Sequence, residues 1–214
     1  MRELIEKKDL DGIRKALSEN PELANAGVPL SLFGIKAHPL HRICDGVIGG
    51  KYSDEQALEM AKIFLEFGAN IDGNELVEKH DTPLIAAASL GAEKTGLFYI
   101  DRGANIFHAG CHGGTALHWA AWCGHDKLVE KLLEKGAKID KLCIDHKATP
   151  IFWALHGRKE GGDGNQKNQA ECAKILFNAG ADTSIPNGAG DSLFTLLDEN
   201  DLELLALLKF ELKC

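Results

Sequence analysis

The sequence has no long hydrophobic run and no excess of positive charge. No apolar stretch reaches the roughly 18 residues of a membrane span, and residues 1–8 are too charged for a signal peptide. The formal net charge of −8 disfavours a general affinity for phosphate backbones, which draws on clustered Lys and Arg. We therefore expect a cytoplasmic protein that binds neither nucleic acid nor membrane, and a basic or cationic partner would be easier to attract.

The sequence also lacks a disulfide framework, because its six cysteines show no paired spacing. A cytosolic chain of this size has no need of disulfides, so reduced thiols are predicted. Cys44 and Cys172 fall at core positions of expected helices and should act as small buried hydrophobes.

No catalytic pattern is present, so we expect no enzymatic activity and no cofactor. Neither a nucleophile elbow nor a plausible set of Ser, His and Asp can be assembled from the sequence. Residues 46–53 fail as a phosphate loop because Tyr52, and not Ser or Thr, follows Lys51. Residues 157–168 lack the alternating oxygen ligands of a calcium loop. Both segments are predicted to be flexible turns.

The clearest pattern that is present spans residues 113–140 and predicts one helix-turn-helix unit. Thr115 can accept hydrogen bonds from the first amides of a helix over 116–123, and Gly124 turns the chain. Gly136 ends a second helix with a left-handed residue. The apolar face of that second helix consists of Leu128, Val129, Leu132 and Leu133.

This unit resembles the ankyrin-repeat family. The family's Thr-Pro-Leu-His-x-Ala box appears as residues 115–120, its Gly-His turn as residues 124–125 and its Gly-Ala doublet as residues 136–137. Similar helix starts stand at Pro39, Pro83, Ala116, Pro150 and Ser192. Two of the intervals, 33 and 34 residues, match the family period, whereas intervals of 44 and 42 residues indicate insertions between the paired helices of two units.

The resemblance implies an all-α ankyrin-repeat solenoid of about six helix-turn-helix units, with short hairpin fingers and degenerate terminal caps. We expect one domain over 1–214, in which each unit is stabilised by burying its apolar face on its neighbours. The predicted segments are an N-terminal cap and connector at 1–37, repeats at 38–80, 81–113, 114–147 and 148–190, and a C-terminal cap at 191–214. One unit departs from the pattern: Gly96 stands in the middle of its outer helix, which predicts either a closely approaching neighbour or a weak helix.

The resemblance also implies a protein–protein interaction module, because the family meets partners on the concave face of its inner helices and at its finger tips. All three tryptophans fall on this surface, and Trp is enriched at binding hot spots. Trp119, Trp122 and Trp153 are therefore the predicted anchors, although packing against the neighbouring repeat is the stronger interpretation for Trp119 and Trp153. The other predicted contacts are Arg42, Asp45, Ser89, Cys123 and His156 on the inner helices, and Glu78, Lys79, Asp81, His112, Asp145 and His146 on the fingers.

Two alternatives remain open at this point. The partner is an unidentified protein and the chain is expected to be a monomer, but the tryptophan surface could instead serve self-association. Cys111, His112, Cys143 and His146 approximate two pairs of zinc ligands, so a zinc- or small-ligand-binding protein is the alternative function. His112 and His146 hold equivalent places in successive fingers, and stacked helical units lie about 8–10 Å apart, which favours polar finger tips over a shared ion. The remaining histidines of the repeat motifs, His41, His118 and His125, are predicted to be structural.

Overall fold

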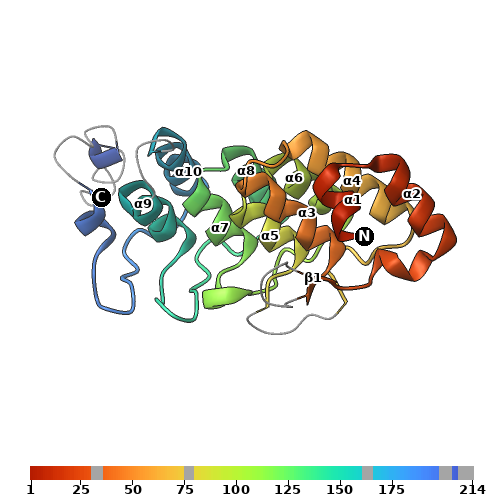
Figure 1. Ribbon diagram of the computed structural model, residues 1–214. Helices are drawn as coiled ribbons and strands as arrows, with labels where there is room; N and C mark the ends of the chain where they lie inside the picture. Colours follow the sequence, from red (N-terminus) through yellow and green to blue (C-terminus); the bar gives the residue numbers. More distant parts are fainter. Residues whose placement is uncertain (30–35, 75–79, 161–165, 198–203, 207–214) are drawn as a thin grey trace. The chain divides into compact units, whose positions relative to one another are not determined.

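The structure is a computed structural model that describes residues 1–29, 36–74, 80–160, 166–197 and 204–206. It consists mainly of stacked α-helix pairs, which confirms the predicted fold class (Figure 1). The chain divides into two compact units, Met1–Asn105 and Ile106–Cys214, and each is described by itself. Within the described residues, no helix is both long and apolar enough to cross a membrane.

The first unit contains three helix pairs in its described residues. These are α1 (Arg2–Lys7) with α2 (Leu10–Glu19), α3 (Pro39–Ile48) with α4 (Asp54–Glu66), and α5 (Pro83–Ser89) with α6 (Glu93–Asp101). The inner helices α3 and α5 pack on each other, as do the outer helices α4 and α6. The helix starts follow from local chemistry: Pro39 and Pro83 stand at first helical positions, and Ser53 forms a capping box with Gln56.

The connector before α3 contains two short elements in its described residues. A short 3₁₀ helix, η1 (Pro21–Ala24), is followed by a two-residue antiparallel pair, β1 (Val28–Pro29) with β2 (Lys36–Ala37). The apolar residues between the two strands, Leu30, Leu32, Phe33 and Ile35, lie outside the described residues.

The second unit contains two complete helix pairs, α7 (Ala116–Cys123) with α8 (Asp126–Glu134), and α9 (Pro150–Glu160) with α10 (Gln166–Asn178), in its described residues. The inner helices α7 and α9 pack on each other, and α8 packs on α10. The loops that precede α9 and follow α10 extend to the same side of these helices (Figure 1). Two short 3₁₀ helices, η2 (Cys111–Gly113) and η3 (Leu193–Leu196), flank the pairs, and Leu193 is buried at the end of the stack.

The two insertions are less loop-like than the sequence indicates. Helix α3 continues to Ile48, so it takes up the first residues of the segment at 46–53. Helix α9 runs on to Glu160 and α10 begins at Gln166, while residues 161–165 lie outside the described part. The insertions therefore lengthen the helices, and the prediction of flexible turns throughout both segments was wrong.

Candidate functional site

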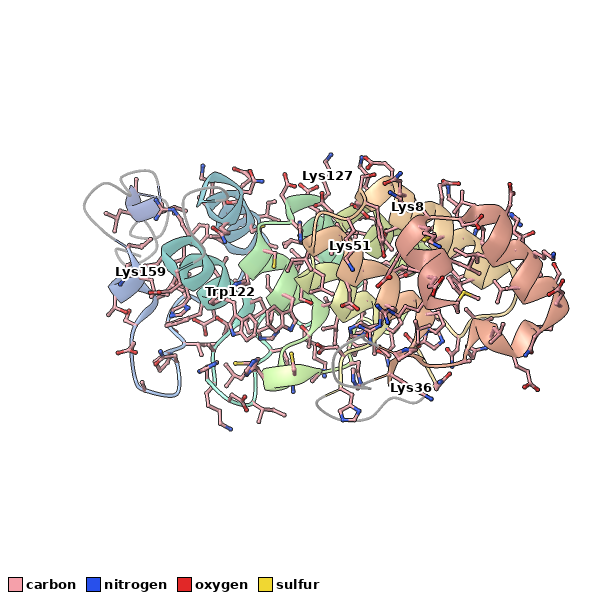
Figure 2. The ribbon with its side chains drawn as sticks, viewed as in Figure 1. Lys8, Lys36, Lys51, Trp122, Lys127 and Lys159 are labelled. Carbon is pink, nitrogen blue, oxygen red and sulfur yellow. The ribbon has the colours of Figure 1, made fainter. Side chains whose placement is uncertain are left out.

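The second unit contains an aromatic pocket of about 320 Å³. Inner helices and hairpin loops together supply its wall, and Figure 2 shows Trp122 on the side of the helices from which the loops extend. The residues that line this aromatic pocket are His112, Trp119, Trp122, His146, Ala148, Phe152, Trp153, His156 and Asn187.

Three aromatic pairs in the wall join residues that lie one repeat apart. Trp119 and Trp153 meet edge to face, with ring centroids 5.0 Å apart and planes at 85°. Trp122 and His156 are 5.2 Å apart, and His112 and His146 are stacked at 6.1 Å. Each pair is separated by 34 residues, so the in-register stacking of α7 on α9 and of the loops below them brings the partners together.

Trp153 is the centre of this cluster and is only 6% exposed. It contacts Trp119, Trp122 at 5.8 Å and the buried His118 at 5.2 Å, in each case at a steep angle between the rings. The packing interpretation therefore holds for Trp153. Trp119 and Trp122 are half-buried and line the pocket, so they keep surface for a ligand.

His118 holds the cluster from behind and is a structural residue. The Thr115 amide donates to its Nδ1 at 3.1 Å, and its Nε2 donates to the Ala148 carbonyl at 3.3 Å. Burial lowers the pKa of His118 to about 4, so the ring is neutral near pH 7. This arrangement ties α7 to the loop that carries Ala148, a residue of the pocket wall.

The loop side of the pocket is fixed by hydrogen bonds between successive loops. The carbonyl of His112 accepts the amide of Ile144 at 3.0 Å, and the carbonyl of His146 accepts the amide of Gly188 at 2.7 Å. The His112 side chain donates from Nδ1 to a carboxylate oxygen of Asp145 at 2.9 Å. His112 also has a φ of 56°, a left-handed conformation that costs a non-glycine residue about 1 kcal/mol or more.

One polar atom of the cluster is left unsatisfied. Among the described residues, the indole Nε1 of Trp119 is buried and has no hydrogen-bond partner. An unpaired buried donor costs about 1–3 kcal/mol. The cluster therefore carries a strained backbone at His112 and an unpaired donor at Trp119, which is common where a surface serves binding as well as stability.

Arg42 and Asp45, two of the predicted contact residues in the first unit, pair with each other. Arg42 is buried and donates from Nε to the carbonyl of Val28 at 3.3 Å. Both residues line a polar pocket of about 150 Å³, where Glu6 accepts from Arg2 at 3.2 Å and pairs with Lys51. Arg42 and Asp45 thus line a pocket of their own unit and are not among the residues that line the aromatic pocket.

The other predicted contacts are dispersed. Ser89 at the end of α5 is half-buried and donates to the Ala86 carbonyl, and Asp81 before α5 is half-buried. Cys123 at the end of α7 is half-buried, and burial raises its pKa to about 11. Glu78 and Lys79 lie outside the described residues.

The zinc alternative finds no support in the geometry. Among the described residues, no three His, Cys, Asp or Glu side chains are placed to hold a metal ion, although all four proposed ligands are described. Cys143 is buried, and its sulfur accepts the Ala148 amide at 3.4 Å within its own loop. His112 is engaged by Asp145, so Cys111, His112, Cys143 and His146 are not gathered around one point.

Sequence reasoning missed three residues of the wall, namely Ala148, Phe152 and Asn187. Phe152 stands beside Trp153 in the box, and its aromatic character was a usable signal. Asn187 belongs to the next loop, 41 residues after His146, so the insertion in α9–α10 hid its equivalence.

Comparison with known proteins agrees with this architecture. Residues 52–143 match the family model for ankyrin repeats, in three copies. An ankyrin repeat domain-containing protein, SAT10, from Stachybotrys chartarum is 31% identical over 107 residues, which are 50% of this chain and 5% of that protein. A putative palmitoyltransferase, ZDHHC13, from Danio rerio is 28% identical over 107 residues, again 50% of this chain and 15% of that protein. The chain thus spans only a small part of these relatives.

Proposed function

We propose that the chain is a recognition module that holds a partner protein at the aromatic pocket, because residues 52–143 match the family model for ankyrin repeats, which are typically protein–protein interaction modules. The proposed role is non-catalytic and is carried out by a monomer in the cytosol. The five described cysteines are free thiols, which agrees with a reducing compartment.

The observation that carries the proposal is the convergence of three aromatic pairs on one open pocket. Half-buried Trp119 and Trp122 offer large rigid surfaces, while Trp153 and His118 hold them in place from behind. Tryptophan in a pre-formed hollow is the commonest kind of interface anchor, because it buries much area at a small cost in side-chain entropy.

Affinity capture from the native source, followed by quantitative binding, tests the proposal. Wild-type chain should retain a partner that the Trp122→Ala variant binds with an affinity weaker by about 2 kcal/mol, or roughly 30-fold. Leu142→Ala is the matched control, because Leu142 is an exposed apolar residue of the same unit that does not line the pocket.

Both variants must first match the wild type in circular dichroism and in unfolding free energy. A captured partner that binds equally to the wild type and to a Trp122→Ala, His156→Ala double variant would show that the pocket is not the docking site.

A further inference from the structure

The chemistry of the pocket wall indicates what the partner inserts there. We infer that the aromatic pocket receives the cationic end of a lysine or arginine side chain from a basic segment of the partner protein. This inference rests on the proposed function and adds the chemical class of the anchor.

The first argument is the orientation of the indoles. The Trp153 ring stands at 85° to Trp119 and at 72° to Trp122. Two rings that meet edge to face form a corner, and a face of each ring bounds this corner. All three indole rings line the pocket. The face of an indole carries the negative part of its quadrupole and attracts a cation within about 6 Å of the ring centroid.

The second argument is the charge around the pocket. Neither Lys nor Arg lines it, whereas two lining residues hold carboxylates at its loop side. His112 donates to Asp145 at 2.9 Å, and the Asn187 side-chain amide donates to Asp191 at 2.9 Å. The Lys147 side chain lies against Gly188 in the neighbouring loop and is the cation nearest to this group along the chain. Asp145 and Asp191 therefore bring two carboxylates to the loops beside the pocket, in a chain of net charge −8.

The third argument is fit. A pocket of about 320 Å³ is at the small end of the range for ligand sites and suits one long side chain. The methylenes of lysine or arginine can pack along the indoles while the charged end reaches the carboxylates at the loop side.

A pair of probes that differ in charge but hardly in shape separates these occupants. Nα-acetyl-arginine amide and Nα-acetyl-citrulline amide are titrated separately into the full chain at pH 8, and the three indole N–H signals are followed by NMR. The arginine probe should shift these signals saturably and bind about two- to fivefold more tightly than the citrulline probe, the ratio expected for a cation over an exposed aromatic face.

Variants test the two parts of the wall. Trp122→Leu should abolish saturable binding of the arginine probe. The Asp145→Asn, Asp191→Asn double variant should weaken binding of the arginine probe severalfold and leave the citrulline probe unchanged. Both carboxylates are exposed, so this variant remains informative even if Trp122→Leu fails to fold. Leu142→Ala should bind both probes like the wild type.

Equal affinity for the two probes, or no saturable shift with the arginine probe, would overturn the cationic anchor. Neither result would touch the proposed function, since a partner could still dock there through an apolar side chain. The proposed function fails only if the partner's affinity survives the loss of Trp122 and His156.

Discussion

The carboxylate of Asp54, at the start of α4, caps the start of the neighbouring helix α6 through Thr95. Its oxygens accept the backbone amide of Thr95 at 3.1 Å, the hydroxyl of Thr95 at 2.6 Å and the amide of Lys94 at 2.5 Å. Helix α6 has no cap from its own preceding residue, Ala92. These hydrogen bonds explain why Thr95 stands where the reference unit has the larger Leu128.

We expect Asp54→Ala to lower the unfolding free energy by about 1–2 kcal/mol, because three charge-assisted hydrogen bonds at a helix start are lost. Urea unfolding followed by far-UV circular dichroism measures the change. Glu55→Gln is the control: Glu55 pairs with Lys94 on the exposed surface, so its loss should have little effect. Equal stability of Asp54→Ala and wild type would mean that solvent caps α6 equally well.

The close contact between α9 and α7 predicts a second sensitive position. A Cβ added to Gly157 would lie 2.6 Å from the carbonyl oxygen of Trp122, so Gly157→Ala must push α9 away from α7. We expect a loss of about 1–3 kcal/mol of stability, although alanine is the better helix former. The measurement is urea unfolding followed by tryptophan fluorescence, which reports on the second unit alone because all three tryptophans lie there.

Gly49→Ala provides the comparison for that variant, and because Gly49 lies in the first unit, the urea unfolding of both variants is also followed by far-UV circular dichroism. Gly49 has a φ of −76°, and a Cβ there would have its nearest neighbour at 3.4 Å. If Gly157→Ala were as stable as Gly49→Ala, the contact between α7 and α9 would be looser than its geometry indicates.

His118 predicts a loss of stability in weak acid. Burial lowers its pKa from 6.5 to about 4 in the folded chain, so between these values the unfolded chain binds more protons. The stabilisation is complete above pH 6.5 and is lost as the pH falls towards 4, with a decrease of about 2–3 kcal/mol in the unfolding free energy by pH 4.5. Urea unfolding at pH 7 and pH 4.5, followed by tryptophan fluorescence, measures the decrease. An NMR titration assigns it to this ring, and a midpoint near 6.5 for His118 would contradict the prediction.

Thiol reactivity should follow burial. Cys44, Cys143 and Cys172 are buried, and burial raises the pKa of Cys44 well above its ordinary value. Cys123 is only half-buried, but its pKa of about 11 lowers its thiolate fraction at pH 8 by about 100-fold relative to a pKa of 9. Iodoacetamide labelling of native chain, resolved by peptide mass spectrometry, should therefore modify Cys111 before these four. Chain unfolded in guanidinium should lose this order, and early labelling of Cys44 in native chain would show that its helix opens locally.

The helical repeats were predictable because each one has local markers. Thr82 and Thr115 cap helices α5 and α7, and the left-handed Gly124 and Gly136 end helices α7 and α8 or follow them closely. The role of Thr95 was not readable from the sequence, since its hydrogen-bond partner Asp54 lies 41 residues away. Glycine at position 157 similarly suggested a turn, whereas a close approach of two helices requires it inside α9.

The repeat period could be read from the sequence alone, and with it the placement of Trp119, Trp122, Trp153 and His156 on one surface of the inner helices. Similar repeats stack in register because each has the same helix propensities and the same spacing of apolar residues. Residues one period apart therefore occupy equivalent places. The tertiary structure was needed to show that these residues and Asn187 line one pocket, and that Arg42 and Asp45 line a different one. It also showed that the sulfur of Cys143 accepts a hydrogen bond from an amide of its own loop. Those outcomes depend on insertion lengths, ring angles and hydrogen bonds between loops. They are set by packing between segments that are distant in the sequence, and such packing leaves no local sequence pattern.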